Sequence, residues 1–157
     1  MPDASEVVLK FDGGARGNPG PAAYGYVICA PDGETLASGG ETIGTATNNV
    51  AEYRGLIEGL RRAETFGVRR VTARGDSELV IRQMRGEWRM RSPALRAIQE
   101  EARALAERFE AVRFEHVPRE QNREADELVN AALDAASAPF RATGGSPRNA
   151  ARYRGGS

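Results

Sequence analysis

The sequence predicts a single α/β domain whose strands and helices follow the order βββαβααβα. Near its start, three apolar runs are separated by short segments rich in glycine, proline and aspartate, which predicts an antiparallel meander of three strands. The apolar residues then recur at helical spacing, and a short strand after that helix makes a parallel crossover possible. We therefore expect an α/β fold with five strands and four helices.

The first three strands are expected at residues 7–12, 24–30 and 35–43. The segment GGARGNPG follows the first of them and predicts a loop, because glycine allows tight turns and close approach of the backbone to a ligand. Residues 31–33, Pro-Asp-Gly, predict the next turn. Gly39 and Gly40 indicate a bulge or a close backbone approach within the third strand.

Helical spacing begins at the segment TNNVAEY, where Asn48 or Asn49 suits the N-cap, and Gly67 suits the C-terminal end of this helix. A short strand is expected at residues 69–75. Ser77 and Ser92 have the character of caps for two further helices. The remaining elements, a helix, a helix, a strand and a helix, are expected at residues 77–84, 92–109, 112–116 and 123–136.

Composition limits the classes of protein to consider. The 157 residues are 40% hydrophobic and carry no net charge, so we expect one domain over residues 1–136, and any polyanion would be held by local clusters or metal ions. Residues 137–157 are rich in Ala, Gly, Ser, Pro and Arg and predict a disordered tail, either a solubilising extension, a weak tether for nucleic acid or a linker. One cysteine and no long apolar segment predict a cytoplasmic protein without a membrane span.

Four acidic residues stand where predicted elements begin or end. Asp12 and Asp76 end strands, and the other two lie in the first turn of a helix and early in the last helix: Glu52 and Asp126. Because neighbouring carboxylates repel and raise each other's pKa, a site built from all four is best explained by bound hard cations such as Mg²⁺ or Mn²⁺. The alternative is that each is a surface acid or a charge favoured by a helix dipole.

Four segments resemble the signature blocks of type 1 ribonuclease H, in the family's order and spacing: DGGARGNPGPAAYG, TNNVAEYRGLIEGL, RGDSELVIRQMRGEW and HVPREQNREADELVNAAL. The resemblance covers about residues 7–136. It implies the ribonuclease H fold, a mixed five-stranded sheet with helices on both faces, in a compact bacterial or archaeal form. The segment GEWRMRS stands where many members have a long basic handle, so we expect weaker or less selective hybrid binding.

The resemblance implies a metal-dependent endonuclease that hydrolyses the RNA strand of RNA–DNA hybrids. Two ions, Mg²⁺ or alternatively Mn²⁺, would be held by Asp12, Glu52, Asp76 and Asp126. One ion would activate a water and the other would stabilise the departing 3′ oxygen, leaving a 5′-phosphate and a 3′-hydroxyl. We expect a monomer, with double-stranded RNA as a further candidate substrate. The competing hypothesis is a non-catalytic module of the same fold that binds hybrid or double-stranded RNA, and the four intact acids argue against it.

His116, the only histidine, precedes Asp126 by the interval at which the family has a mobile histidine that assists the water or releases product. Here it continues directly from the fifth predicted strand, so it is either catalytic or a structural residue at the strand end. Asn122 matches the family position that orients the water or contacts substrate.

Substrate contacts are also implied by the resemblance, because a hybrid must be recognised through a 2′-hydroxyl on one strand and a DNA groove on the other. Thr47 matches a position that grips a DNA phosphate, although it and the asparagines could cap the helix. Trp88, surrounded by arginines, is either a stacking contact or a core anchor. The remaining candidates are Gly14, Asn18, Asn48 and Asn49.

Overall fold

The structure, a computed structural model, describes residues 5–137 of the chain. Five strands form one sheet in the spatial order β3-β2-β1-β4-β5. β1 pairs antiparallel with β2 and β2 with β3, whereas β4 is parallel to both β1 and β5. The strands are β1 (Glu6–Ala15), β2 (Gly20–Cys29), β3 (Thr35–Ala46), β4 (Arg70–Gly75) and β5 (Ala111–His116). The predicted mixed five-stranded sheet is confirmed.

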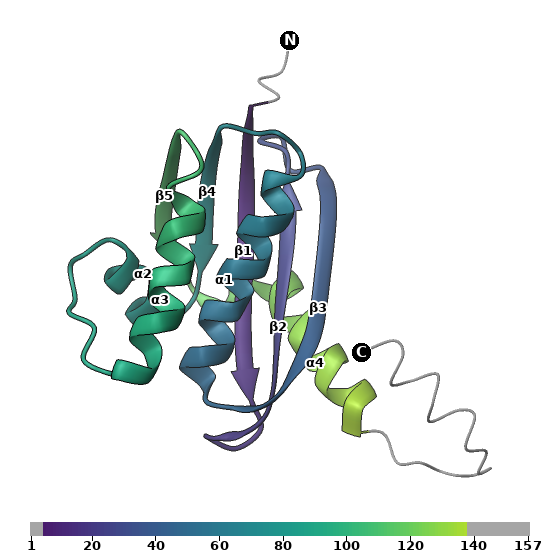
Figure 1. Cartoon of the computed structure of the whole chain (residues 1–157). Coiled ribbons are helices and arrows are strands. Elements are labelled where there is room, and N and C mark those ends of the chain that lie inside the picture. Colours follow the sequence, from purple (N-terminus) through teal and green to yellow (C-terminus); the bar gives the residue numbers. More distant parts are fainter. Residues whose placement is uncertain (1–4, 138–157) are drawn as a thin grey trace.

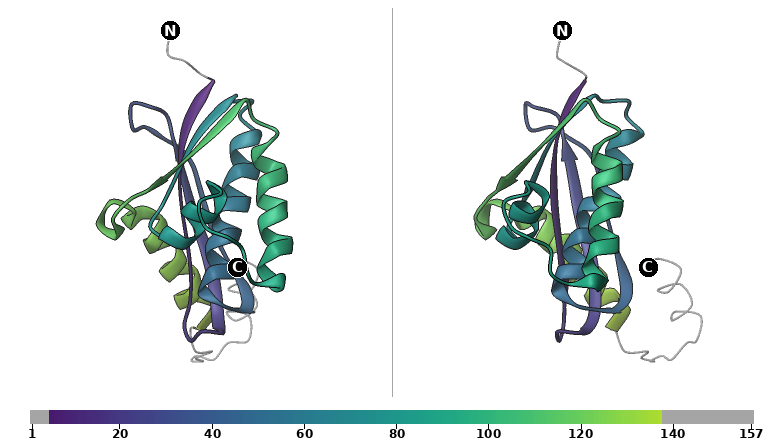
Figure 2. Two further views of the ribbon diagram at one scale, coloured as in Figure 1. Left: turned by 90° about the vertical axis from the view of Figure 1, so that its left-hand side faces the viewer. Right: turned by 60° about the vertical axis from the view of Figure 1, so that its left-hand side comes forward.

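Helices cover both faces of this sheet (Figures 1 and 2). One face carries α1 and α3, and α4 packs on the other face, against β2 and β3. The larger core lies under α1, α2 and α3, and a smaller cluster of Ala23, Val129 and Leu133 lies under α4. The helices are α1 (Asn48–Glu64), α2 (Glu78–Met84), α3 (Pro93–Ala106) and α4 (Arg123–Ser137), with a 3₁₀ turn η1 (Arg119–Gln121) that the sequence did not predict.

β1 is longer than predicted, because it continues through Gly13 and Gly14 to Ala15. The expected start of the loop after residue 12 was therefore wrong, since the loop is confined to residues 16–19. Asp12 lies inside the strand, opposite Gly25 of β2. The physical reason is the packing of α1. A Cβ on Gly13 would lie 2.1 Å from main-chain atoms of Ala51, so this glycine serves close approach of a helix and not a turn.

The start of α1 also differs from the prediction. Thr47 is the N-cap, and its hydroxyl accepts a hydrogen bond from the backbone N–H of Val50 at 3.3 Å. The side chain of Asn48, one of the two predicted caps, instead accepts from the backbone N–H of Ala15 at 2.8 Å. The first turn of α1 contains no acidic residue, so Glu52 lies beyond it.

The predicted caps of the next two helices are confirmed. Ser77 accepts from the backbone N–H of Val80 at 3.3 Å, and Ser92 from that of Leu95 at 3.2 Å. α3 ends at Ala106, earlier than predicted. Residues 85–92 join α2 to α3 without a helix, so the long handle is absent. The predicted tail lies outside the described residues, apart from Ser137, which ends α4. No helix in the described part is long and apolar enough to cross a membrane.

Candidate active site

One cavity of about 420 Å³ is lined by all four acids that the sequence singled out. It lies where β1 meets the N-terminal part of α1, the end of β4 and the first turn of α4. Its acidic lining consists of Asp12, Glu52, Asp76 and Asp126. Asp12 and Asp126, which are 114 positions apart in the chain, thus share one cavity.

Two glycines bring β1 and α1 together beside Asp12. Gly13 faces the main chain of α1, and a Cβ on Gly55 of α1 would lie 2.4 Å from the carbonyl oxygen of Asp12. A larger residue at either position would separate the strand from the helix. This close contact places Asp12 and Glu52 on one wall of the cavity, and it leaves Asp12 only 7% exposed.

Asn122 fastens α4 to the same strand. Its side-chain amide donates a hydrogen bond to the main-chain carbonyl oxygen of Phe11 at 2.9 Å. Its main-chain carbonyl oxygen accepts one from the backbone N–H of Asp126 at 3.1 Å. Asn122 is completely buried. The side chain is thus closed to bulk solvent, and its Oδ1 has no hydrogen-bond partner among the described residues. Its contact with water or substrate stays a prediction, and its two bonds hold Asp126 next to β1.

Burial and mutual repulsion make the acids of the cavity hard to ionise. Burial, followed by the negative charges of Asp76 and Asp126, raises the pKa of Asp12 to about 8. Burial also raises the pKa of Glu52 to about 7, although a hydrogen bond with Ser77 opposes this. The pKa of Asp76 is raised by burial too, with Arg119 opposing. The folded chain therefore gathers carboxyl groups whose negative charge, once they ionise, its own cations do not balance.

The residues present fit a divalent cation. All donors are carboxylate oxygens, which are the ligands that Mg²⁺ and Mn²⁺ prefer. Glu52 Oε1 is buried without a hydrogen-bond partner among the described residues, as expected of an oxygen reserved for a ligand. Within residues 5–137, no three acidic, cysteine or histidine side chains are already gathered as ligands of one ion. The acids line the cavity without converging on a single point.

Three polar residues of this site were missed in the sequence. Arg119 contacts Asp126 with 3.5 Å between Nη2 and Oδ1. The side chain of Asn130 donates to the main-chain oxygen of Asp126 at 3.1 Å, and Arg16 lines the cavity while pairing with Asp134 at 2.7 Å. Asn130 could have been found, because it follows Asp126 by one helical turn and so shares its face. Arg16 lies in the segment GGARGNPG, which was interpreted through its glycines as a loop.

His116 ends β5 and is opposite Gly75, the neighbour of Asp76, in the parallel ladder. Its side chain is exposed and does not line the acidic cavity, where Arg119 of the following turn is found instead. The sheet therefore brings His116 near the acids without placing it among them.

The candidate substrate contacts divide between two places. Gly14 and Asn48 line the acidic cavity, and Asn18 Oδ1 accepts from the backbone N–H of Asn48 at 3.0 Å. Asn49 and Trp88 line a second cavity of about 490 Å³ between α1 and residues 85–92. Trp88 is 42% exposed, so the core-anchor interpretation was wrong. The guanidinium carbon of Arg82 lies 5.2 Å from the centre of its ring.

The similarities to known proteins agree with this geometry. The model of the reverse transcriptase-like family matches residues 10–132. Ribonuclease HI of Halobacterium salinarum is 50% identical over 135 residues, which cover 85% of this chain and 68% of that protein. A bifunctional protein of Mycobacterium tuberculosis is 49% identical over 133 residues, 84% of this chain. The chain spans only 36% of the length of this and the two other mycobacterial relatives that match equally well.

Solved structures extend the likeness to three dimensions. RNase H1 of H. salinarum has a TM-score of 0.80 at 49% identity, over 82% of this chain and 98% of that one. LC11-RNase H1, solved in complex with an RNA/DNA hybrid, has a TM-score of 0.80 at 42% identity, over 83% and 98% of the two chains. Ribonucleases H depend on metal ions, as the all-carboxylate site would lead one to expect. Sequence, fold and site agree that this chain belongs to the type 1 ribonuclease H family, in a compact form without the basic handle.

Proposed function

We propose that this chain is an endonuclease that hydrolyses the RNA strand of RNA–DNA hybrids. The observation that carries the proposal is that one cavity is lined by Asp12, Glu52, Asp76 and Asp126. In it, a buried carboxylate oxygen of Glu52 has no hydrogen-bond partner among residues 5–137. The names of the relatives support it, since one is a ribonuclease HI and another was solved with an RNA/DNA hybrid. Double-stranded RNA as a second substrate, a monomeric state and a cytoplasmic location belong to the same proposal.

The four carboxylates would hold two ions, Mg²⁺ or Mn²⁺. When bound, the ions would supply an activated water and stabilise the departing 3′ oxygen, giving a 5′-phosphate and a 3′-hydroxyl. Asp12 must lose its proton to act as a metal ligand. Because its pKa is raised, this loss requires a higher pH than for an ordinary aspartate. Asn122 keeps Asp126 in place relative to Asp12 through its bond to β1. Activity should therefore rise with pH across the range in which Glu52 and Asp12 ionise.

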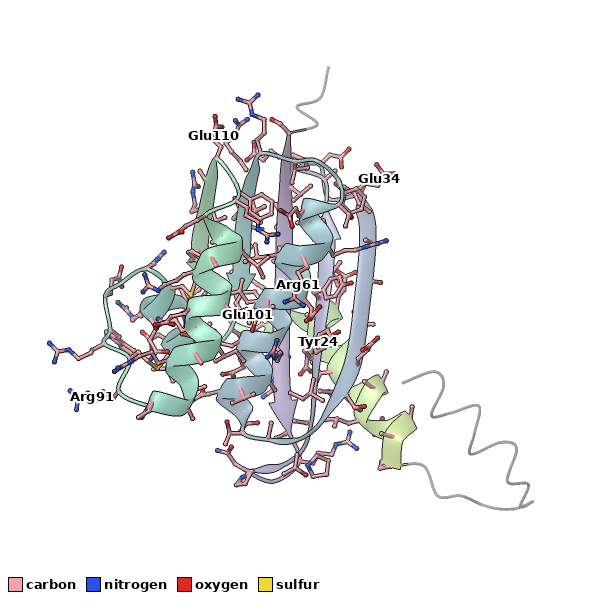
Figure 3. All side chains as sticks on the ribbon, in the orientation of Figure 1. Tyr24, Glu34, Arg61, Arg91, Glu101 and Glu110 are labelled. Carbon is pink, nitrogen blue, oxygen red and sulfur yellow. The ribbon has the colours of Figure 1, made fainter. Side chains whose placement is uncertain are left out.

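The loop of residues 85–92 offers positive charge to a nucleic acid backbone. Many arginines elsewhere form ion pairs with glutamates, such as Arg61 with Glu101 at 2.6 Å (Figure 3). Arg89 and Arg91 form neither an ion pair nor a hydrogen bond with any described residue, and Arg91 extends away from the rest of the chain (Figure 3). Beside them, the exposed ring of Trp88 can stack on a base or sugar. This loop takes the place of the missing handle.

The test is cleavage of an RNA–DNA hybrid labelled on either strand, with Mg²⁺, with Mn²⁺ and with EDTA. We expect the RNA strand alone to be cut, only when metal is present. Glu52→Gln should reduce cleavage to the level of the EDTA sample, because it removes a charged ligand at nearly constant shape. Glu34→Gln is the matched control, since Glu34 is exposed in the β2–β3 turn (Figure 3) and does not line the cavity. A wild-type protein that binds hybrid but cuts nothing with either ion would favour the non-catalytic module instead.

A further inference from the structure

Gln83, the penultimate residue of α2, is the centre of a buried polar network that the active site does not use. Its side chain is only 4% exposed, and its Oε1 accepts from the hydroxyl of Tyr53 at 2.8 Å. Its Nε2 lies 3.9 Å from the sulfur of Met90. The main-chain carbonyl oxygen of Gln83 accepts hydrogen bonds from the side chains of Gln99 at 3.3 Å and Arg103 at 3.1 Å. The network therefore connects α1, α2, α3 and the loop of residues 85–92.

Met90 is the buried anchor of this loop, whose first residues are also held by main-chain bonds to α2 and by a bond from Arg85 to the carbonyl oxygen of Phe114. It is 8% exposed, whereas residues 85–89 and 91 are all exposed. Its carbonyl oxygen also accepts from Arg96 at 3.4 Å. Since the neighbours of Met90 include Trp88, Arg89 and Arg91, the contact of Gln83 with Met90 restrains the segment that carries the unpaired arginines.

The other end of the network reaches the helix that carries a candidate metal ligand. Tyr53, which bonds to Gln83, directly follows Glu52 on α1 and is completely buried. Glu52 lines the acidic cavity, and Gln83 lines the second cavity together with Asn49 and Trp88. One hydrogen bond and one sulfur contact thus connect the helix of the acidic cavity to the loop beside the second cavity.

We propose that Gln83 is a positioning residue that holds the loop of residues 85–92 at a fixed place relative to the acidic cavity. This inference rests on the proposed function, because it assigns the loop to hybrid binding. A loop that is ordered before the substrate arrives loses less conformational entropy on binding. Breaking the network should therefore weaken binding of the hybrid and leave the cleavage step itself intact.

The experiment uses Gln83→Leu, which removes both side-chain bonds but keeps the carbonyl oxygen and the buried volume. Met90→Leu is a second variant that retains an apolar anchor and removes the sulfur contact, in case Gln83→Leu does not fold. Ile28→Val is the control, since it alters the core on β2, an element that the network does not include. Trp88 is the only tryptophan of the chain, so fluorescence anisotropy reports on this loop alone.

In Gln83→Leu we expect lower fluorescence anisotropy of Trp88, because the loop is less restrained. We also expect both KM and the Kd for hybrid to rise about tenfold, since one or two more side chains must become ordered on binding. The kcat should stay within about twofold of the wild-type value, and Ile28→Val should change none of these quantities. A fall in kcat at unchanged KM would overturn the inference, because it would place the effect at α1 and Glu52. Failure of the wild-type protein to bind or cut hybrid would overturn the proposed function, whereas unchanged anisotropy in both network variants would overturn the positioning of the loop.

Discussion

Asp12→Asn should stabilise the metal-free protein while abolishing metal-dependent cleavage. The pKa of Asp12 is raised from 3.8 to about 8, first by burial and then by Asp76 and Asp126. Between these two pH values the folded protein retains a proton that the unfolded chain has released. The contribution of Asp12 to stability is thus fully present below pH 3.8 and is lost as pH rises through about 8. Asparagine has nearly the same shape as aspartate but no charge. The unfolding free energy of the variant therefore does not decrease in this way as pH rises.

The size of the effect follows from the two pKa values. A tenfold change in proton affinity is worth about 1.4 kcal/mol, so the shift of Asp12 sets an upper limit of roughly 5–6 kcal/mol above pH 8. Asp12 titrates together with its acidic neighbours, which share part of this energy. We expect a net gain of about 2–4 kcal/mol in the unfolding free energy of Asp12→Asn at pH 8, and a much smaller gain near pH 4.

Urea unfolding in EDTA, repeated between pH 4 and pH 9, measures this gain. The difference between Asp12→Asn and the wild type should grow with pH. Asp32→Asn, a change of the same kind in the exposed β2–β3 turn, should follow the wild type at every pH. An Asp12→Asn protein that is less stable than the wild type at pH 8, or a difference that does not depend on pH, would refute the reasoning.

Other substitutions test the geometry around the cavity. Gly13→Ala should destabilise the fold by at least about 3 kcal/mol in thermal unfolding because its Cβ would meet the main chain of α1, whereas Gly14→Ala, with 3.8 Å to its nearest neighbour, should cost less than about 1 kcal/mol. Asn122→Ala should cost about 1–3 kcal/mol in urea unfolding and lower kcat more than it raises KM, because its amide joins α4 to β1. His116→Ala should lower kcat for hybrid less than tenfold, since that side chain does not line the cavity. Arg91→Ala should reduce the slope of log Kd against log salt by about one, the loss of one phosphate contact.

The order of elements could be predicted because the signals are local. The serines that cap α2 and α3 stand directly before the apolar residues of those helices, and the structure uses both as caps. The extent of β1 could not be predicted, because a glycine that turns the chain and a glycine that admits a helix look the same in the sequence. Gly13 is of the second kind, and only the position of Ala51 in three dimensions shows it.

The residues of the site likewise divide into those that the sequence indicates and those that only the three-dimensional structure shows. The four acids were selected by their places at element ends and by the resemblance to a family, and the fold brings them to one cavity. Arg16 lies beside Asn130 across 114 positions of sequence, so no local pattern indicates that contact. Asn122 was selected by its match to a family position, but its burial could not be inferred from its type, because asparagine is usually exposed.

The balanced net charge of the chain conceals two opposite imbalances. Many arginines of the described part pair with acids at the surface, where such pairs contribute little to stability. Among the described residues, Arg119 and Arg16 are the cations that line the acidic cavity, and Arg16 is already paired with Asp134. Arg89 and Arg91 have no acidic partner among the described residues. Divalent ions would neutralise the acids of the cavity, and phosphates would neutralise Arg89 and Arg91. Both imbalances would therefore be compensated only in the complex of protein, metal and nucleic acid.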